Sequence, residues 1–279
     1  ALGTGQTLAA TTRLVAAHDK YRFEGEDLGY CFAAQIQAQI DDMNANGIKF
    51  AGFLADSIFS SDGVMPNPIG FLKKAVDVVH ANDGIFIADE VQPGFARTGD
   101  SFWGFGRHGV VPDIITTGKP MGNGIPVSGL LAKDHVLSAF SQKIPYFNTF
   151  GGNPVAMAAA QAVLKTIQEE ELQAHSQRLG GLLLTELRKL MEKYDCVGDV
   201  RGAGLFIGFE LVQDRFTKMP DKALALDLIE ELRNTHRVLT SVAGPYGNVL
   251  KLRPPLVFQE KDIDWLVGAL DQALSKLQK

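Results

Sequence analysis

The first half of the chain alternates between amphipathic stretches and short apolar runs. Apolar residues at helical spacing predict helices over residues 32–43 and 72–79, which end at Asn46-Gly47 and Asn82-Asp83-Gly84. Short apolar runs predict strands within residues 50–59, 85–88, 113–117 and 127–132. The run Ile85–Ala88 has no polar member, which is typical of a parallel strand covered on both faces. This alternation predicts an α/β fold built on a mainly parallel sheet.

The pattern changes after Phe150. Asn153-Pro154 predicts a helix start, because Asn caps helices and Pro suits their first turn, and an Ala-rich helix is expected to about Gln168. Further on, the pattern predicts a helix through Leu183–Tyr194, a strand pair around 205–212, a helix over 225–232, strands near Val238 and Leu250, and a last helix over 263–274. We therefore predict two domains, a large one over residues 1–160 and a small α+β one over residues 161–279.

The composition is that of an ordinary folded protein, with 46% hydrophobic and 21% charged residues among 279. A net charge of −5 argues against a nucleic-acid binder that works by bulk positive charge. No apolar stretch is long enough to predict a membrane span, and Ala1–Gly5 does not resemble the start of a signal peptide. The two cysteines and the scattered histidines lack metal-site spacing. We expect a cytoplasmic protein.

Three predicted strand ends carry polar residues, at the edge where α/β folds place their sites. Asp89 and Glu90 follow the first of these strands, and that run alone favours a solvated rim. Lys119 follows the next strand among glycines, where desolvation lowers the pKa of an amine and makes it nucleophilic, although the local run alone favours a surface lysine. Residues 148–154 fit an anion site at a helix start and a simple capped turn equally well. His108 is interpreted as a loop residue.

Several short motifs follow one another along nearly the whole chain. They are Asp89-Glu90-Val91-Gln92-x-Gly94-Phe95-x-Arg97-Thr98-Gly99, Pro112-Asp113-Ile114, Gly118-Lys119-Pro120-x-Gly122-Asn123-Gly124, Thr149–Pro154, Val200-Arg201-Gly202-x-Gly204-Leu205 and Leu252-Arg253-Pro254-Pro255-Leu256. Each motif is weak alone, but the ordered set resembles the class III aminotransferases. These enzymes depend on pyridoxal 5′-phosphate and have the fold-type I architecture. The resemblance implies part of their large parallel-sheet domain followed by their small C-terminal α+β domain.

The resemblance assigns roles to five residues. Lys119 would form the Schiff base with the cofactor aldehyde and then move protons as general base and acid. Asp89 would pair with the pyridine nitrogen and keep it protonated, and Gln92 would hydrogen-bond near the phenolic oxygen. Thr149 would reach the cofactor phosphate of the partner subunit in a homodimer. Arg253 would bind a substrate carboxylate through its planar guanidinium, although an arginine at a strand end can also simply pair with an acid.

One departure from the family concerns the substrate. The strand that usually ends Glu-Pro in the family here ends Asp56-Ser57 and continues through Ser60-Ser61-Asp62-Gly63. This loop resembles the branch that contains alanine–glyoxylate aminotransferase 2-like proteins and phospho-lyases acting on amino-alcohol phosphates. We expect transfer of an amino group from an amino donor to an oxo acid. Elimination of phosphate from a phosphorylated amino alcohol is the alternative reaction.

A second departure concerns the front of the chain. Family members carry a further N-terminal portion with a Gly-Ser-rich loop for the cofactor phosphate and an aromatic residue that stacks on the ring. The resemblance therefore implies that this chain corresponds to the carboxyl part of such an enzyme and binds free cofactor weakly. A non-catalytic module that binds a partner is a further alternative. A nicotinamide-dependent dehydrogenase is disfavoured, because no Gly-x-Gly-x-x-Gly follows a first strand.

Overall fold

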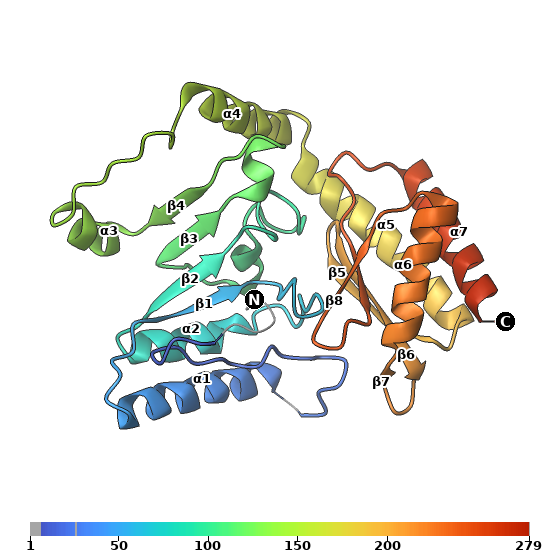
Figure 1. Cartoon of the computed structure of the whole chain (residues 1–279), viewed down its shortest axis with the longest axis horizontal. Coiled ribbons are helices and arrows are strands. Elements are labelled where there is room, and N and C mark those ends of the chain that lie inside the picture. Colours follow the sequence, from blue (N-terminus) through green and yellow to red (C-terminus); the bar gives the residue numbers. More distant parts are fainter. Residues whose placement is uncertain (1–6, 26, 279) are drawn as a thin grey trace. The chain divides into compact units, whose positions relative to one another are not determined.

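The computed structural model describes residues 7–25 and 27–278, which form two compact units (Figure 1). The first unit comprises the chain up to Ser57, Pro68–Phe95 and Trp103–Thr166, and the second comprises Ile58–Asn67, Ala96–Phe102 and the chain from Ile167. No pattern in the sequence predicted the two short early segments of the second unit, and the domain boundary near residue 160 stays a prediction. The stretch Ala1–Gly5, used above to argue against a signal peptide, lies outside the described residues.

The first unit alternates helices with strands. Its elements are α1 (Leu28–Ala45), β1 (Gly52–Asp56), α2 (Leu72–Ala81), β2 (Ile85–Asp89), the 3-10 helix η1 (Gly104–His108), β3 (Ile114–Thr117), the 3-10 helix η2 (Lys119–Gly122), β4 (Gly129–Ala132), α3 (Asp134–Ser141) and α4 (Pro154–Glu169). In its described sheet, of order β1-β2-β3-β4, the first three strands are parallel and β4 is antiparallel to β3. The predicted α/β class is therefore confirmed. Because β1, β2 and β3 run in the same direction, their carboxyl ends share one edge.

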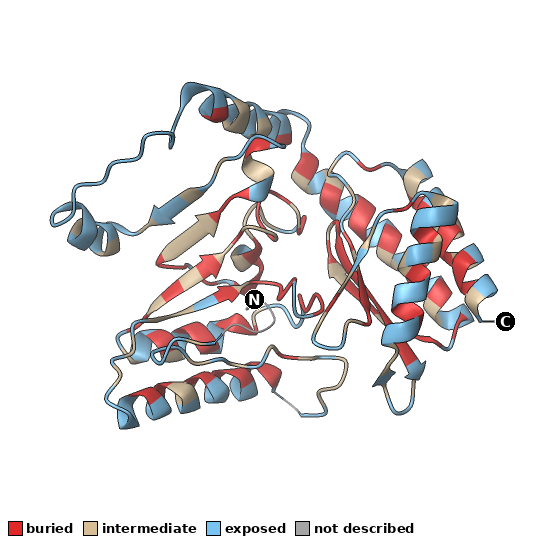
Figure 2. Cartoon of the chain, viewed as in Figure 1, coloured by how far each residue is buried: buried red, intermediate tan, exposed pale blue. Residues whose placement is uncertain are grey.

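Helices α1 and α2 bury the residues whose spacing predicted them. Ile36 and Ile40 of α1 and Val79 of α2 are at most 2% exposed. Asp27 caps α1 by accepting a hydrogen bond from the backbone N–H of Tyr30 at 2.8 Å. In Figure 2 the buried residues of α1 gather on the side that faces the rest of the unit. Burial of one apolar face thus fixes both helices on the sheet.

Strand β2 is packed on one face only. Phe86 and Ala88 are fully buried, while Ile87 is half-buried, as period-two alternation requires when the two faces differ in cover. Phe53 stacks on Phe86, with ring centroids 6.1 Å apart, on the face that α1 covers through Phe32. Leu54, the register partner of Ile87, is 60% exposed on the other face. The prediction that this strand is covered on both faces is therefore wrong for the described residues.

The second unit packs helices against an antiparallel sheet. Its elements are α5 (Leu172–Lys193), β5 (Val197–Ala203), β6 (Phe206–Asp214), β7 (Met219–Pro220), α6 (Lys222–His236), β8 (Ser241–Ala243), β9 (Val249–Leu252) and α7 (Glu260–Leu277). The described strands have the order β5-β6-β9-β8, with β7 paired to β6. No strand forms at Val238, because its N–H closes the end of α6 on Leu232 O at 2.9 Å after Arg237 turns left-handed.

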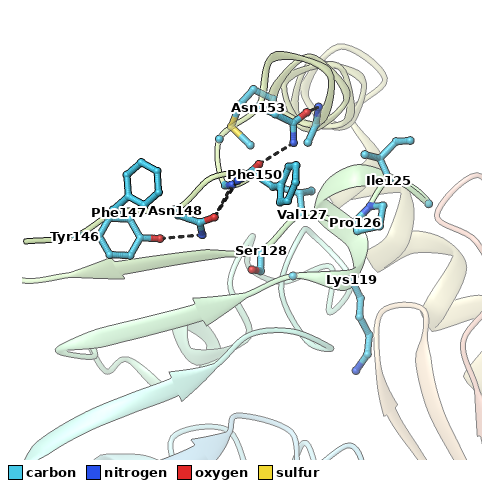
Figure 3. A pocket seen from close by; sticks show the side chains of 16 residues that line it. Lys119, Ile125, Pro126, Val127, Ser128, Tyr146, Phe147, Asn148, Phe150 and Asn153 are labelled. Carbon is cyan, nitrogen blue, oxygen red and sulfur yellow. Dashed lines mark hydrogen bonds between the residues drawn. The ribbon is translucent and has the colours of Figure 1, made fainter.

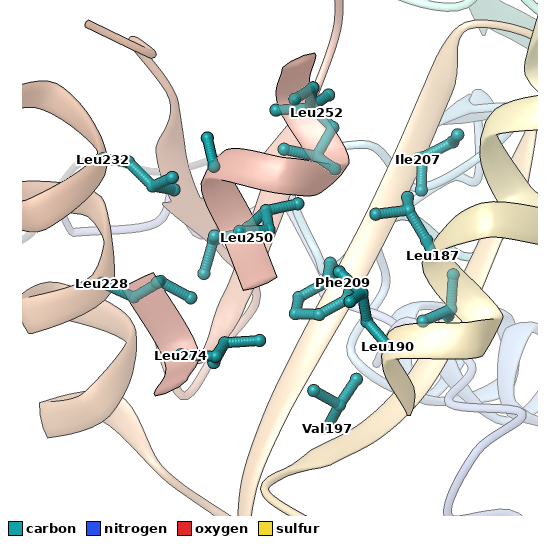
Figure 4. Packing of buried hydrophobic residues seen from close by; sticks show 14 of the residues in the cluster. Leu187, Leu190, Val197, Ile207, Phe209, Leu228, Leu232, Leu250, Leu252 and Leu274 are labelled. Atoms are coloured by element: carbon teal, nitrogen blue, oxygen red, sulfur yellow. The ribbon is translucent and has the colours of Figure 1, made fainter. Parts of the chain in front are cut away.

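The core of the second unit lies between this sheet and α5, α6 and α7 (Figure 4). Leu183 and Leu187 of α5, Phe209 of β6 and Leu270 of α7 are all fully buried in it. The predicted apolar face of α5 is thereby confirmed. Burial of each such side chain contributes about 1.5–3 kcal/mol, so this unit holds together through its own apolar interior.

Candidate active site

Three parallel strands of the first unit end in one row of polar residues. Asp56, the last residue of β1, is the register partner of Asp89 at the end of β2. Asp89 is in turn the partner of Thr116 in β3. Residues paired across a sheet project from the same face, so these side chains leave the sheet together. Lys119 follows three residues after Thr116, which brings an amine to the edge that carries two carboxylates.

Asp89 is the last residue of β2, and Gln92 lies in the turn that follows. Asp89 is half-buried, and its Oδ1 accepts a hydrogen bond from the N–H of Val91 at 3.0 Å. This bond within the turn folds the chain back immediately beyond the strand. Gln92 is also half-buried, so both side chains belong to the carboxyl edge without being sealed inside the protein.

Lys119 begins η2, separated from the end of β3 by one residue. Gly118 before it is buried and Pro120 after it lies in the first turn, where proline is favoured. Lys119 itself is exposed, so the desolvated surroundings expected from the sequence are absent among the described residues. Two residues earlier, Thr117 Oγ1 is buried and has no hydrogen-bond partner within residues 7–25 and 27–278. The edge therefore presents an exposed amine, two residues after a buried hydroxyl at the end of β3.

A hollow of about 1150 Å³ opens beside Lys119 (Figure 3). It is lined by Gly118 and Lys119, by residues 124–128 and by parts of the segment that leads into α4, including Tyr146, Phe147 and Asn153. Asn153 Oδ1 accepts from the N–H of Ala156 at 3.0 Å and so caps α4, as the sequence predicted. Lys119 extends away from Tyr146 and Phe147 in Figure 3, so its amine is not enclosed by their rings.

The structure brings three of the five predicted site residues together. Asp89, Gln92 and Lys119 share the carboxyl edge of one sheet. Thr149 is exposed in the connection between α3 and α4 and is not among the residues that line the hollow. Arg253 follows β9 in the second unit, where its guanidinium lies 5.6 Å from the ring centroid of Phe206. The roles of all five residues stay predictions.

Glu90 is the residue that sequence reasoning misjudged. The solvated rim favoured for Asp89 and Glu90 is wrong for Glu90, whose exposed fraction is 0%. Burial raises its pKa to about 7, although hydrogen bonds from Gly104, Phe105 and Ser57 act in the opposite direction. The signal was present in the chain, because Glu90 continues the period-two positions of Phe86 and Ala88 on the buried face.

His108 is a buried residue of η1 rather than a loop residue. Its Nδ1 accepts a hydrogen bond from the N–H of Gly70 at 3.1 Å, so its Nε2 carries the proton and donates to Ser57 O at 2.8 Å. Burial lowers the pKa of His108 to about 4. A neutral imidazole therefore fastens η1 to the end of β1, beside the carboxyl edge.

The fold and this edge together define a fold-type I α/β protein, and the comparisons with known proteins place it further. The family model described as Aminotransferase class-III matches residues 3–274. The chain is 43% identical over 244 residues to an alanine–glyoxylate aminotransferase 2-like protein of Drosophila melanogaster, covering 87% of this chain and 49% of that protein. It is 40% identical over 253 residues to ethanolamine-phosphate phospho-lyase homolog 1 of Caenorhabditis elegans, covering 90% and 54%. A phospholyase from Arthrobacter, solved in complex with phosphoethanolamine, superposes with a TM-score of 0.93 at 37% identity, covering 98% of this chain and 65% of that one.

The chain therefore belongs to the class III aminotransferases, and it spans about half the length of the curated relatives it matches. The cofactor of this family is pyridoxal 5′-phosphate. Its aldehyde forms a Schiff base with an amine, and its basic ring nitrogen pairs with a carboxylate. Lys119 and Asp89 supply those groups from one sheet edge. The buried hydroxyl of Thr117, which has no hydrogen-bond partner among the described residues, ends the strand that leads to Lys119. The residues present fit the cofactor.

Proposed function

We propose that this chain carries the lysine-bearing part of a pyridoxal 5′-phosphate-dependent aminotransferase, which moves an amino group from an amino donor to an oxo acid. The observation that carries the proposal is the register pair of Asp89 and Thr116. It brings the Asp89 carboxylate at the end of β2 and Lys119, which follows β3, to the same edge, within the residues that match the family. The bound cofactor supplies the electron sink for the reaction.

Two residues of the protein handle protons in different ways. Lys119 Nζ takes a proton from the substrate carbon that bears the amino group and returns a proton during transfer. The carboxylate of Asp89 would hold a proton on the ring nitrogen of the cofactor, and Gln92 would hydrogen-bond near its phenolic oxygen. Exposure of Lys119 supports this assignment, because an incoming amine and the cofactor both have to reach Nζ.

Arg253 is the proposed ligand of a substrate carboxylate. Its guanidinium lies over the Phe206 ring, and its chain neighbour Pro254 offers its carbonyl to the guanidinium of Arg97. The planar donor group suits two hydrogen bonds to a carboxylate. The proposed amino donor therefore carries a carboxylate.

We also propose that the protein works as a homodimer in which Thr149 reaches the cofactor phosphate of the partner subunit. Its neighbours Phe147 and Phe150 are 85% and 81% exposed, and Tyr146 is 74% exposed. Aromatic side chains gathered on a surface favour a contact with another protein. Size-exclusion chromatography with light scattering tests the oligomer, and a monomer at micromolar concentration contradicts it.

The proposed location is the cytoplasm. Within residues 7–25 and 27–278, the helices are too short or too polar to cross a bilayer. Fractionation of cells that express the tagged protein tests the location. Recovery with mitochondria or membranes would overturn it.

Phosphate elimination from a phosphorylated amino alcohol is the second candidate function. It is favoured by Asp56-Ser57 at the end of β1 and by similarity to the Arthrobacter phospholyase solved with phosphoethanolamine. Both reactions begin with removal of a proton by Lys119. They differ in the next step: in transfer Lys119 would deliver a proton to a carbon other than the one it came from, whereas in elimination the electron pair left on the substrate carbon would expel the β-phosphate.

The test adds pyridoxal phosphate to the purified protein, to Lys119→Ala and to Lys143→Ala, whose lysine is an exposed residue of the same unit. We expect a visible absorbance band that depends on Lys119 alone, and borohydride reduction should attach the cofactor at Lys119. An amino donor with an oxo acid should then yield a new amino acid, whereas released phosphate from phosphoethanolamine would indicate the lyase. Equal spectra for all three proteins would contradict the proposed function.

A further inference from the structure

Glu90 is a fully buried carboxylate that no proposed catalytic step uses. Its Oε1 accepts hydrogen bonds from Ser57 Oγ at 3.0 Å and from the N–H of Phe105 at 2.9 Å. Its Oε2 accepts from the N–H of Gly104 at 2.6 Å. Three donors therefore converge on one carboxylate from the end of β1 and from η1. Such an environment stabilises one fixed position of the side chain.

The backbone of Glu90 is held as firmly as its side chain. Its N–H donates to Thr116 O in β3 at 2.9 Å, and its carbonyl accepts from the N–H of Gly94 at 3.2 Å. One residue thus joins the ends of β1, β2 and β3 to η1 and to the turn that carries Gln92. Its neighbour in the chain is Asp89, whose side chain accepts a hydrogen bond from the N–H of Val91 within the same turn.

From this arrangement we propose that Glu90 is a positioning residue, which with Ser57 fixes the turn after β2 so that the Asp89 carboxylate meets the cofactor ring nitrogen. The proposal rests on the proposed function. Neighbouring residues of an extended segment project to opposite faces. Glu90 therefore lies on the buried face of the sheet, and Asp89 lies on the opposite face. A carboxylate that must pair with one ring atom needs its supporting contacts held to a fraction of an ångström.

Ser57 is the one side-chain donor among the three hydrogen-bond donors to Glu90 described above. The backbone N–H groups of Gly104 and Phe105 can only donate, whereas a serine hydroxyl both donates and accepts. The hydroxyl of Ser57 supplies the side-chain donor to Glu90, a contact that a residue without a hydroxyl cannot make. The carbonyl of Ser57 is held by His108 Nε2 at 2.8 Å, which keeps the hydroxyl next to Glu90.

The first test measures hydrogen exchange in the cofactor-free protein. Glu90→Gln places an amide N–H₂ among donors, and Ser57→Ala removes one donor. We expect the amide of Val91, whose acceptor is Asp89 Oδ1, to exchange roughly tenfold faster in Glu90→Gln and to change less in Ser57→Ala. The matched control is Asp113→Asn, which alters a buried carboxylate on the amino end of the same sheet. It should speed exchange at Phe86, whose N–H donates to Asp113 Oδ2 at 2.8 Å, and leave Val91 unchanged.

The second test compares pyridoxal phosphate with an analogue whose ring nitrogen is replaced by carbon. If Glu90 acts through Asp89, Glu90→Gln weakens binding of pyridoxal phosphate roughly tenfold and leaves binding of the analogue nearly unchanged. A general structural defect would weaken both ligands equally. Asp113→Asn should bind both ligands as the unmodified protein does.

The two tests separate the inference from the function on which it rests. Equal losses for both ligands, or unchanged exchange at Val91, would overturn the role of Glu90. If Glu90→Gln does not fold, the same two measurements on Ser57→Ala, exchange at Val91 and binding of the two ligands, test the inference. A protein that binds cofactor without dependence on Lys119 contradicts the proposed function, while exchange at Val91 still reports whether Glu90 holds the turn.

Discussion

The Nζ of Lys133 lies 2.8 Å from Oδ1 of Asp113, at the end of β3 opposite to Lys119. Asp113 directly precedes β3 and Lys133 directly follows β4, and these two strands are antiparallel, so their outer residues meet. The N–H of Lys133 also donates to Asp113 O at 3.0 Å. This ion pair therefore closes the strand pair whose other end presents Lys119.

Replacing Lys133 with methionine removes this ion pair and should lower the free energy of unfolding more at neutral pH than at acidic pH. Burial disfavours the ionised form of Asp113, but hydrogen bonds from Lys133, Phe86 N–H and His80 prevail and lower its pKa to about 2. A lowered folded-state pKa stabilises the protein above about pH 4, and this contribution is lost as pH falls toward 2. Urea unfolding of Lys133→Met should show a cost of about 1 kcal/mol at pH 7 that shrinks at pH 3, because the lysine is partly exposed. A cost independent of pH would contradict this.

Asp89→Asn should reduce amino transfer by about a hundredfold or more, because a neutral amide cannot hold a proton on the ring nitrogen. The fold should not suffer, since Asp89 is half-buried and the asparagine oxygen can still accept from the N–H of Val91. Steady-state kinetics together with thermal unfolding check both parts. Asp100→Asn, an exposed aspartate of the second unit, is the control and should retain activity. Unchanged turnover in Asp89→Asn would remove Asp89 from the proposed site.

Glu90 should make stability fall as pH rises through the neutral range. Burial raises its folded-state pKa from 4.5 to about 7, helped by the nearby charge of Asp56 and opposed by its three hydrogen bonds. A raised folded-state pKa gives a contribution that is complete below about pH 4.5 and lost as pH approaches 7. The change amounts to about 3 kcal/mol between these limits. Unfolding of the unmodified protein and of Glu90→Gln, measured from pH 4.5 to 8, should therefore give curves that are not parallel, whereas parallel curves would show that Glu90 is ionised throughout.

Removing the charge of Glu210 should destabilise the second unit strongly. Glu210 Oε2 lies 2.6 Å from Arg201 Nη1, both side chains are buried, and Arg201 also binds Val64 O at 2.8 Å. Breaking a buried pair leaves an uncompensated charge and costs about 3–5 kcal/mol, so Glu210→Leu should cost that much in urea unfolding. The double variant Glu210→Leu with Arg201→Met should cost less than the sum of the two single changes.

The exposed pair Lys189–Glu186 provides the comparison for this buried pair, with a distance of 2.7 Å on the surface of α5. Lys189→Met should change stability by no more than about 0.5 kcal/mol, because solvent screens exposed charges. A similar cost at both pairs would show that burial is not the reason for the effect at Glu210.

Much of the fold was predictable because its signals are local. The spacing of Ile36, Ile40 and Val79 and the cap at Asn153 are short-range features, and the structure confirms the helices that they predicted. The ends of strands were less predictable. Val238 follows the end of α6 and is not in a strand, because Arg237 adopts a left-handed conformation with φ 56°, which no apolar pattern reveals.

The candidate site divides in the same way. Lys119, Asp89 and Gln92 were found from ordered motifs, and strand direction then brings them to one edge. The placement of Ile58–Asn67 with the second unit could not be predicted, because it depends on Arg201, far along the chain, holding the carbonyl of Gly63. The buried partners of Glu90 likewise come from β1 and η1, at separations of 33 and 14 residues.

The sequence by itself determined the α/β class and the family, and it supplied the residues proposed for the chemistry, since period, capping and motif order are local features of the chain. Only the tertiary structure decided which carboxylate is solvated and which is sealed. Asp89 and Glu90 are adjacent and chemically alike, yet one is half-buried at the edge and the other has no exposed surface. The physical reason is that burial and pKa depend on what other segments place around a side chain. For Glu90 those segments are the end of β1 and η1.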